Sequence, residues 1–372
     1  MGDAASAWAI EGKARFQIGD SFYRPQTEVA RDLGVLAAAL HRQEIGRLRV
    51  LDAMAGCGVR ALRYFLEGQA DAVWANDSNS DIQSVLQGNL QTLPTDRYLV
   101  TCWDANRVFF DCYNRQDFYD FIDLDCFGAA APYLSTSLWA GEIGGLLYLT
   151  STDGRSLTGH SPEVAVAAYG SYTRNHPAAH EQGLRVLIGA AQQQAAAKGL
   201  GIQPLFSFYF RNTYRILVRL VPQSGLSSQN YGFLGYCHTC GEYQLASWRQ
   251  LGKVSCAECA SMLTIGGPLW LGPLHEAAFL EGLMTLAQQW HWSERAELLG
   301  LMAAEASPDL PPYFYTLGEI GRRGQLDIPP RSALIYQLQD LGYRACPTHI
   351  NPQAIKTNAT LQTCIQAARS GQ

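Results

Sequence analysis

The sequence predicts an α/β fold in which a parallel sheet is closed by an antiparallel hairpin, followed by a second domain with a cysteine-rich module. Between about residues 47 and 220, short apolar runs alternate with helical patterns, as expected for a parallel sheet. The last two runs, IQPLFSFYF and TYRILVRLV, alternate with a period of two on either side of Arg211-Asn212, which indicates a hairpin. A parallel sheet that ends in such a hairpin is typical of Rossmann-like class I methyltransferases rather than of dehydrogenases.

The domain boundary is expected at a linker rich in proline, glycine and serine, PQSGLSSQNYG (222–232). Residues 1–222 would form the α/β domain and residues 223–372 an α+β domain, because 372 residues suit two domains better than one. The cysteine-rich module spans about residues 233–267, and mainly helical patterns follow it. The last helix is expected to start near Pro329-Pro330 and to end near Gly342.

The composition is that of an ordinary globular protein, with 47% hydrophobic residues, 16% charged residues and a formal charge of −5. This charge argues against a strongly electrostatic nucleic-acid binder but leaves room for a local basic patch. No apolar run has the length of a membrane span, and the first residues lack the regions of a secretory signal. Ten cysteines without such a signal indicate a reducing compartment. We therefore expect a cytoplasmic protein that does not bind membranes, and no obligatory protein partner is evident.

Each strand-like run before the hairpin ends near an aspartate. Ligands of open α/β sheets bind outside the carboxyl ends of the strands, so these side chains mark the expected site. The runs are RLRVLDA, ADAVWAND, RYLVTCWDA, YDFIDLD and GGLLYLTSTD, and the aspartates are Asp52, Asp77, Asp104, Asp125 and Asp153.

A loop with two glycines, in LDAMAGCGVRALRYF, follows the first of these runs. Gly56 and Gly58 would let backbone N–H groups approach a ligand where a strand turns into a helix, although a tight structural turn would use the same residues. Asp77 follows about twenty residues later, where a carboxylate accepts ribose hydroxyls. Asp104 ends the third run, where an adenine amino group would lie. Together with Asp52 these residues predict an adenosyl ligand, and the absence of GxxxxGK[ST] favours S-adenosylmethionine over ATP.

The segment DLDCFGAAAPYL (123–134) places two carboxylates at the end of the fourth run. The amine of a nucleobase is a poor nucleophile, and an acceptor for its N–H would align the nitrogen with a methyl donor and stabilise the developing positive charge. Asp125 is the candidate acceptor, and Phe127 is expected to hold a base that has left its stack. Asp123 points to the other face of the strand and is expected to orient a neighbour. The alternative is that both carboxylates only cap the following helix.

The cysteine-rich module contains two Cys-x2-Cys pairs that are separated by fifteen residues. Cys237, Cys240, Cys256 and Cys259 match a four-thiolate zinc ribbon, for which four unrelated buried thiols are the alternative. Because four thiolates fill the coordination shell of Zn²⁺, the ion would be structural and not catalytic.

At the level of motifs, the chain resembles the family of tRNA (guanine-26-N2)-dimethyltransferases. The similarity extends from about residue 20 to residue 358. The segments that carry it are SFYRPQTEVARDLGV, GCGVRALRYF, FIDLDCFG, GGPLWLGPLHEAAF, PPYFYTLGEIGRRG and GYRACPTHINPQAIKTNA. The last three segments have no obvious chemistry of their own, so they distinguish this family from other methyltransferases.

The resemblance implies transfer of one or two methyl groups from S-adenosylmethionine to the N2 amine of guanine 26 of tRNA. It adds Arg31, Arg60 and Ala105 to the expected cofactor-binding residues, next to Asp77 and Asp104. Cys126 stands where the family usually has proline, so the rigid φ of proline is lost while the backbone carbonyl remains.

The C-terminal domain is expected to recognise tRNA, because basic side chains near aromatic ones suit an RNA that is bound through its backbone and shape. Solvated arginines and core aromatic residues are the alternative. These residues are Arg322, Arg323, Arg331, Arg344 and Lys356, with Trp290, Trp292, Tyr313 and Tyr315. Three rival functions stay open: methylation of another guanine in tRNA or ribosomal RNA, a catalytically degenerate RNA-binding zinc-ribbon protein, and a small-molecule methyltransferase.

Overall fold

The computed structural model describes residues 8–370. The first seven residues of the N-terminal stretch, from which the absence of a secretory signal was inferred, lie outside the described part. Within residues 8–370, no helix is both long and apolar enough to cross a membrane.

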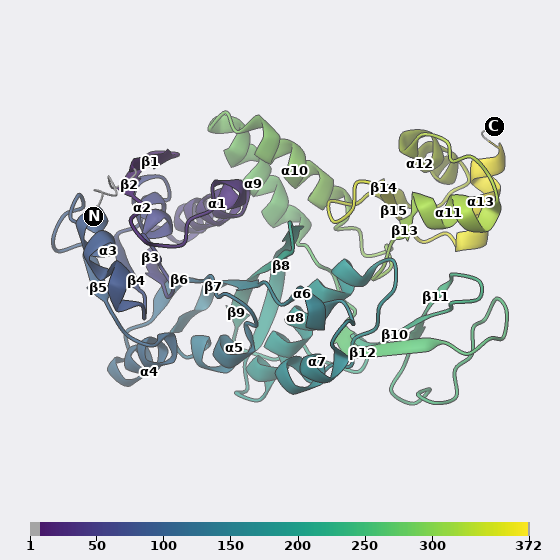
Figure 1. Ribbon diagram of the computed structural model, residues 1–372, viewed down its shortest axis with the longest axis horizontal. Helices are drawn as coiled ribbons and strands as arrows, with labels where there is room; N and C mark the ends of the chain where they lie inside the picture. The colour runs from purple at the N-terminus through teal and green to yellow at the C-terminus, as the bar shows by residue number, and fades with distance from the viewer. Residues whose placement is uncertain (1–7, 371–372) are drawn as a thin grey trace, which may run out of the picture. The chain divides into compact units, whose positions relative to one another are not determined.

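The alternating part of the chain forms a mixed, Rossmann-like sheet of seven strands in the order β5-β4-β3-β6-β7-β9-β8 (Figure 1). Strands β3 to β7 pair in parallel, and β3 lies between β4 and β6. The predicted α/β sheet is therefore confirmed. The strands are β3 (Arg49–Asp52), β4 (Ala72–Asn76), β5 (Tyr98–Thr101), β6 (Tyr119–Leu124), β7 (Gly141–Ser151), β8 (Gly201–Phe210) and β9 (Thr213–Val221).

Helices cover both faces of this sheet, with α1 and α2 on one side and α4 and α5 on the other (Figure 1). All six residues of β6 are buried, as expected for a strand that is covered on both faces. Helix α1 is capped at its C-terminus by Gly46 in the left-handed conformation (φ 77°). The helices are α1 (Glu28–Ile45), α2 (Val59–Leu66), η2 (Ser80–Ile82), α3 (Gln83–Leu90), α4 (Ala105–Arg115) and α5 (Ala131–Ser137).

Strands β8 and β9 are neighbours at one end of the sheet order and are joined by two residues. Both linking residues, Arg211 and Asn212, have positive φ angles of 46° and 64°. A two-residue hairpin turn that matches the twist of its strands requires this conformation.

By its internal contacts the chain forms two compact units. The first contains the described residues up to Ser151 together with Leu217–Pro222 and Gly282–Ala296; the second contains Thr152–Ile216, Gln223–Glu281 and the residues from Glu297 onward. Each unit includes residues from both sides of the expected boundary at residue 222. That boundary stays a prediction about sequence domains.

The N-terminal end of the first unit forms an antiparallel hairpin that the sequence did not reveal. Its strands, β1 (Trp8–Glu11) and β2 (Ala14–Gln17), have four residues each and are too short for a clear alternation of polar and apolar positions. The short helix η1 (Pro25–Thr27) leads from this segment into α1.

The second unit contains two three-stranded sheets, with the strand orders β11-β10-β12 and β13-β15-β14. The strands are β10 (Tyr231–Tyr236), β11 (Tyr243–Ala246), β12 (Thr264–Trp270), β13 (Tyr315–Thr316), β14 (Ala345–Pro347) and β15 (Ala354–Thr357). Its helices are α6 (Gly154–Leu157), α7 (Pro162–Tyr169), α8 (Ala179–Ala196), α11 (Leu317–Gly324), α12 (Arg331–Asp340) and α13 (Leu361–Ser370). Helices α9 (Ala277–Gln289) and α10 (Ser293–Ala304) contribute residues to both units.

The helix that was expected after Pro329-Pro330 is α12, but it is not the last one. Helix α13 follows it, and its buried residues Leu361, Cys364, Ile365 and Ala368 form a stripe at helical spacing. The pattern was overlooked because the small and polar residues between these positions weaken it.

Candidate active site

The carboxyl ends of β5, β4, β3 and β6 lie next to one another in the sheet. They bring four of the five strand-end aspartates to one edge, in the order Asp104, Asp77, Asp52 and Asp125. The sheet order reverses direction between β3 and β6, which is the switch point where ligands of open α/β sheets bind. Asp153 is not one of these four: it belongs to the second unit and caps α6 by accepting a hydrogen bond from the backbone N–H of Ser156 at 3.3 Å.

Asn76, a residue that sequence reasoning missed, fastens three of these strand ends together. Its side chain is fully buried at the end of β4. Its Nδ2 donates to the carbonyls of Ala53 (3.0 Å) and Trp103 (2.9 Å), and its Oδ1 accepts from the Trp103 N–H at 3.0 Å. A buried amide with both ends satisfied fixes the loops that it joins. The signal was a polar residue inside the apolar run AVWAND.

The glycine loop after β3 has the conformation that its residues suggested. Gly56 and Gly58 have φ angles of 57° and 83°, where a side chain would be strained. The N–H of Gly56 donates to Asp77 Oδ2 at 2.8 Å, so the loop and the end of β4 are held together. A methyl group at Gly58 would lie 2.7 Å from Leu90, whereas the nearest atom to one at Gly56 would be the Phe22 carbonyl oxygen at 3.8 Å. Space for a ligand is therefore left at Gly56.

Asp104 is exposed and caps α4, where its carboxylate accepts the N–H of Asn106 at 2.9 Å. Ala105 is buried in the first turn of the same helix. The capping contact explains why an aspartate ends this run even without a ligand, so the roles of both residues toward an adenine stay predictions.

Arg60 lies buried in α2 among three carboxylates. Its Nε is 3.3 Å from Asp123 Oδ2 and 3.9 Å from Asp52 Oδ1, and its Nη1 forms an ion pair with Asp125. The hydroxyl of Tyr64 donates to Asp123 Oδ2 at 2.6 Å. Asp123 is fully buried and holds the side chains of Arg60 and Tyr64, which agrees with the expectation that it orients a neighbour. The expectation that Asp123 points to the other face of the strand was wrong, because Asp123 and Asp125 both contact Arg60, as residues two apart in an extended segment can.

Asp52 is also fully buried, and neither of its carboxylate oxygens has a hydrogen-bond partner within residues 8–370. Burial raises the pKa of Asp52 to about 8; the charge of Arg60 opposes this rise, and the charges of Asp123 and Asp125 add to it. A buried carboxylate without hydrogen bonds is unfavourable unless a ligand supplies a donor or a positive charge. The Arg60 guanidinium lies 3.9 Å away, and a hydrogen-bond donor or a cationic group of a ligand would add to its stabilisation of the ionised form.

The fourth strand end presents both a carboxylate and an aromatic ring. The side chain of Asp125 is 25% exposed, and Phe127 is 88% exposed. Cys126 points the other way, because its thiol is buried and donates to the Thr150 carbonyl at 2.9 Å. The ion pair of Asp125 with Arg60 thus lies at the rim of the site, and the two residues expected to present a base are both accessible.

Phe22 is a second aromatic residue at this site that the sequence did not reveal. Its ring is 70% exposed, and its carbonyl lies beside the glycine loop at Gly56. The Arg24 guanidinium lies 4.6 Å from the centre of the ring. The exposed ring, whose backbone borders the glycine loop, offers a further surface for a flat ligand.

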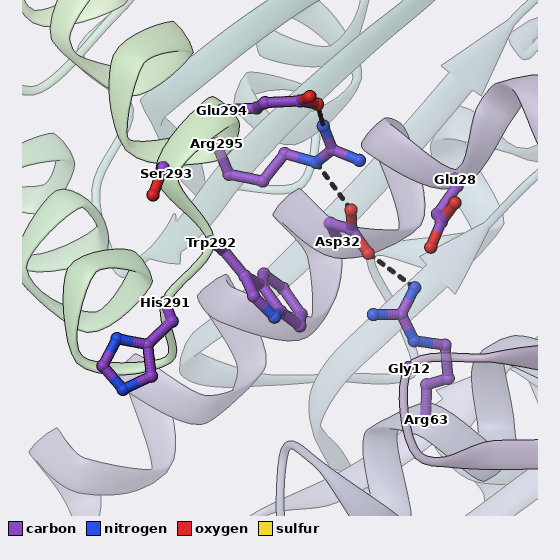
Figure 2. Close-up of a pocket in the computed structure, with 9 residues that line it drawn as sticks. All are labelled: Gly12, Glu28, Asp32, Arg63, His291, Trp292, Ser293, Glu294 and Arg295. Carbon is purple, nitrogen blue, oxygen red and sulfur yellow. Dashed lines mark hydrogen bonds and ion pairs between the residues drawn. The ribbon is translucent and has the colours of Figure 1, made fainter.

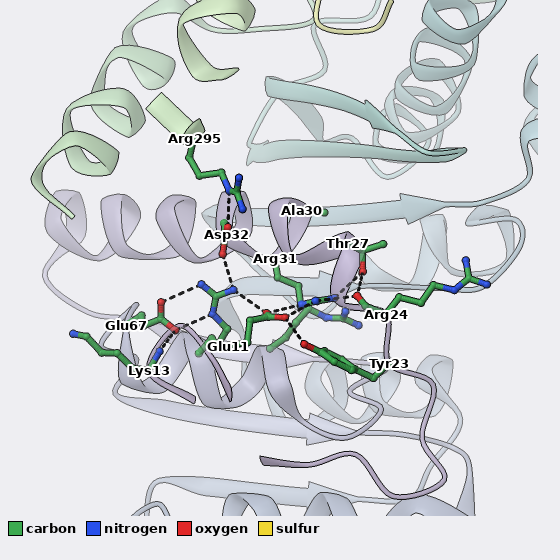
Figure 3. Close-up of polar contacts among 12 residues, drawn as sticks. Glu11, Lys13, Tyr23, Arg24, Thr27, Ala30, Arg31, Asp32, Glu67 and Arg295 are labelled. Carbon is green, nitrogen blue, oxygen red and sulfur yellow. Dashed lines mark hydrogen bonds and ion pairs between the residues drawn. The ribbon is translucent and has the colours of Figure 1, made fainter. Parts of the chain in front are cut away.

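Arg31 is buried near the start of α1 and makes a two-pronged contact with Glu11 (Figure 3). Its Nε donates to Glu11 Oε1 at 2.6 Å, and its Nη1 donates to the Thr27 hydroxyl at 2.7 Å. The expected contact of Arg31 with a cofactor stays a prediction.

A polar cavity of about 360 Å³ lies away from the strand ends, between the N-terminal hairpin, α1, α2 and residues 291–295 (Figure 2). Asp32 joins Arg63 (2.7 Å) and Arg295 (2.6 Å) at its wall, and Trp292 lies beside them. None of the residues expected to bind the cofactor or the base lines it. The strand ends are therefore the candidate active site, because Asp52 with its raised pKa and the glycine loop lie there.

The four cysteines of the predicted zinc ribbon come together in the second unit, with all four sulfur atoms within 4.8 Å of one another. The Sγ atoms of Cys237 and Cys259 are 3.4 Å apart, as are those of Cys240 and Cys256. Four thiolates at about 2.3 Å from a tetrahedral Zn²⁺ would be roughly 3.8 Å from one another. Gly241 (φ 86°) and Ala260 (φ 57°) follow the two pairs and turn each one back toward the centre.

A second group of potential ligands, His275, Glu305 and His349, is also buried in the second unit. The carboxylate of Glu305 accepts hydrogen bonds from His349 Nδ1 (2.6 Å) and from the Thr348 hydroxyl (2.8 Å). The backbone N–H of Ser207 faces His275 Nδ1 at 3.4 Å. Within residues 8–370, these bonds leave His275 Nε2 and His349 Nε2 buried without a hydrogen-bond partner, so hydrogen bonding accounts for only part of the cluster.

The structure corrects one part of the expected RNA-binding set. Lys356 is buried and forms an ion pair with Glu181, so it is not available to a phosphate. Arg323 donates to the carbonyls of Thr239 (2.8 Å) and His238 (3.2 Å) in the first cysteine pair and is therefore largely structural. Arg322 and Arg344 remain mostly exposed, although each also pairs with a nearby carboxylate.

The fold and the acidic edge define a Rossmann-like methyltransferase. From residue 6 to residue 369 the sequence matches the model of the N2,N2-dimethylguanosine tRNA methyltransferase family, and the chain belongs to that family.

Individual relatives agree over nearly the full length. A tRNA (guanine(26)-N(2))-dimethyltransferase of Pyrococcus abyssi is 27% identical over 97% of this chain and 98% of its own. The Thermococcus kodakarensis enzyme of the same name is 29% identical over 91% of this chain and 90% of its own. The solved structure of Trm1 from Pyrococcus horikoshii with S-adenosyl-L-methionine has a TM-score of 0.84 at 26% identity, and it covers 97% of this chain and 99% of that one.

Proposed function

We propose that this protein transfers one or two methyl groups from S-adenosylmethionine to the N2 amine of guanine 26 in tRNA. The observation that carries the proposal is the edge at β3 and β6. A glycine loop, the buried carboxylate of Asp52, which has no hydrogen-bond partner within residues 8–370, and the residues Asp125 and Phe127 lie at these strand ends. It supports the activity named in the relatives, whose sequences align along 97% and 91% of this chain.

The cofactor would lie along the ends of β3, β4 and β5. Gly56 leaves room for it, Asp77 and Asp104 would meet its ribose and adenine, and Asp52 would face its positive charge. Arg31, Arg60, Gly58 and Ala105 complete the proposed set. When bound, S-adenosylmethionine supplies the electrophilic methyl group.

The guanine would enter at the end of β6. Phe127 would stack on the base, Phe22 offers a second exposed ring, and Asp125 would accept an N–H of the exocyclic amine. This hydrogen bond directs the nitrogen lone pair and stabilises positive charge as it develops. Asp123 would act indirectly, by holding Arg60 beside Asp125.

The proposal also covers the terminal hairpin of the sheet, the C-terminal sequence domain and the four cysteines. The sheet would close with the antiparallel hairpin of β8 and β9, as in class I methyltransferases. The sequence domain 223–372 would recognise tRNA, and Cys237, Cys240, Cys256 and Cys259 would hold one structural Zn²⁺. The cytoplasmic location and the absence of an obligatory protein partner stay predictions.

The direct test is incubation of the protein with unmodified tRNA and methyl-labelled S-adenosylmethionine, followed by digestion to nucleosides. We expect label in N2-methylguanosine and N2,N2-dimethylguanosine, and none with a tRNA that carries adenine at position 26. Label in another nucleoside, or no label, would reject the proposal. Methylated guanosine found in the tRNA with adenine at position 26 would show that the enzyme methylates another guanine.

Binding of the cofactor should release close to one proton per molecule at pH 7. Asp52, with its pKa raised to about 8, is mostly protonated in the free protein, and a cationic ligand favours its ionised form. Affinity should therefore rise with pH up to about 8 and then level off. Calorimetry in two buffers of different ionisation enthalpy measures the proton. The Asp52→Asn variant should release none; equal release from both proteins would contradict this role.

Replacement of Phe127 by alanine should weaken productive binding of tRNA. Loss of one stacking surface is expected to lower kcat/KM for tRNA by about tenfold to a hundredfold, while affinity for S-adenosylmethionine stays close to that of the wild type. Phe127→Tyr keeps the ring and should retain most of the activity. If alanine and tyrosine behaved alike, stacking at this position would be excluded.

A further inference from the structure

We propose that Glu11, on the N-terminal hairpin, is a positioning residue that holds Arg31 in the orientation in which Arg31 contacts the bound cofactor. The inference deepens the proposed function and rests on it, because Arg31 is one of the residues proposed to contact S-adenosylmethionine. It gives a role to a hairpin that lies outside the seven-stranded sheet.

The hydrogen bonds of Arg31 leave one donor for a ligand. A guanidinium has five N–H groups. Nε and Nη2 donate to the two oxygens of Glu11 at 2.6 and 2.5 Å, Nη2 also donates to the Arg24 carbonyl at 3.1 Å, and Nη1 donates to the Thr27 hydroxyl at 2.7 Å. Within residues 8–370, the second N–H of Nη1 has no recorded partner. Its direction is set by the other four bonds.

The carboxylate of Glu11 also accepts hydrogen bonds from two side chains other than Arg31 (Figure 3). Arg63 Nη1 donates to its Oε1 at 2.9 Å, and the Tyr23 hydroxyl donates to its Oε2 at 2.9 Å. Burial alone would raise the pKa of this carboxyl, but the hydrogen bonds and charges of Arg31 and Arg63 lower it overall. Glu11 therefore stays ionised and keeps its two-pronged contact with Arg31.

Arg63 is the centre of the surrounding ionic network and provides a matched control. It is fully buried and also binds Asp32 (2.7 Å) and Glu67 (2.8 Å). Glu67 is as buried as Glu11 and shares Arg63 with it, but its remaining bond goes to the backbone N–H of Lys13 at 3.2 Å and not to Arg31. A change at Glu67 thus perturbs the network without touching Arg31.

The expected benefit of this arrangement is preorganisation. A free arginine side chain has many rotamers and must give them up to make a directed bond, whereas Arg31 is already fixed. Because the contact exists in the cofactor complex before reaction, its loss should weaken binding and leave the chemical step nearly unchanged.

The test uses Glu11→Gln and Glu67→Gln in the full-length protein. Calorimetric titration with S-adenosylmethionine should show about tenfold weaker binding for Glu11→Gln, the effect of losing one charge-assisted contact, and less than about twofold change for Glu67→Gln. Thermal unfolding of the cofactor-free proteins should show lowered midpoints for both. At saturating cofactor, kcat of Glu11→Gln should stay within about twofold of the wild type.

A double-mutant cycle identifies Arg31 as the residue through which Glu11 acts. In an Arg31→Lys background, Glu11→Gln should weaken cofactor binding by less than about twofold more. If Glu11→Gln does not fold, Tyr23→Phe serves instead; it removes one bond to Glu11 and should weaken binding by about threefold with a nearly unchanged unfolding midpoint.

Wild-type affinity in Glu11→Gln, or equal weakening in Glu11→Gln and Glu67→Gln, would reduce Glu11 to a structural residue and overturn the inference. Failure of the wild type itself to bind S-adenosylmethionine would instead remove the proposed function. The two failures are therefore distinguishable in one series of titrations.

Discussion

Replacement of Asp125 by alanine is expected to lower kcat by a factor of about 10² to 10⁴, the range for loss of a positioned acceptor in the transition state. Asp125 is a partly exposed carboxylate at the end of β6, two residues before Phe127. Affinity for S-adenosylmethionine should change by no more than a few-fold, because the proposed cofactor residues lie mainly at the ends of β3, β4 and β5. Arg60, which pairs with Asp125, keeps two other carboxylates beside it. Single-turnover methylation of tRNA and calorimetric titration of cofactor measure the two quantities.

The ion pair with Arg60 sharpens this prediction. When Asp125 is replaced, the Arg60 guanidinium still has the carboxylates of Asp123 and Asp52 as neighbours. We therefore expect little change in thermal stability. Asp117→Asn is the matched control, since Asp117 also pairs with an arginine (Arg49, 2.7 Å) but precedes the opposite end of β6. It should leave kcat unchanged. Near-normal turnover of Asp125→Ala would remove Asp125 from the mechanism.

Removal of zinc is expected to unfold the cysteine-rich module. Structural Zn²⁺ contributes about 10–16 kcal/mol to the folding of small four-ligand modules at pH 7, far more than the thiols alone supply. Purified protein should contain one zinc per chain, and a chelator or Cys256→Ser should release it. Elemental analysis and hydrogen exchange over about residues 233–267 measure the outcome.

The effect should be confined to part of the protein. Arg323 fastens α11 to the carbonyls of the first cysteine pair, so exchange in α11 should also increase. Binding of tRNA should weaken more than binding of S-adenosylmethionine. Cys102→Ser, at an exposed thiol outside the cluster, is the control and should retain the metal. Zinc content well below one per chain in the wild type would refute the ribbon.

Local patterns explain why much of the sheet was predictable. The fully buried strand β6 has the mainly apolar sequence YDFIDL. Runs of this kind that alternate with helical patterns indicate a parallel sheet. The cluster of four cysteines was equally visible, because the spacing within each Cys-x2-Cys pair is set by a short turn. The N-terminal hairpin and α13 were missed, since a four-residue strand and a helix with a weak apolar stripe leave little periodic signal.

Side-chain partners were not predictable in the same way. Lys356 was grouped with residues for RNA, yet the fold buries it against Glu181, which lies 175 positions away in the chain. Arg31 was noted through the family resemblance, but nothing in the sequence connects it to Glu11. The contacts of Asn76 and the position of Phe22 beside Gly56 depend on how strand ends and loops pack together, so neither could be inferred from the local sequence.

Local sequence predicted an acidic residue near the end of each parallel strand, a glycine turn after the first strand, and four thiols at the spacing of a metal site. These features depend on residues close together in the chain. The position of Arg60 between Asp52 and Asp125 and the contact of Glu11 with Arg31 depend instead on the packing of distant segments. The energy of a charged group depends on its burial and on its nearest opposite charge, and both are set by which distant segments pack together.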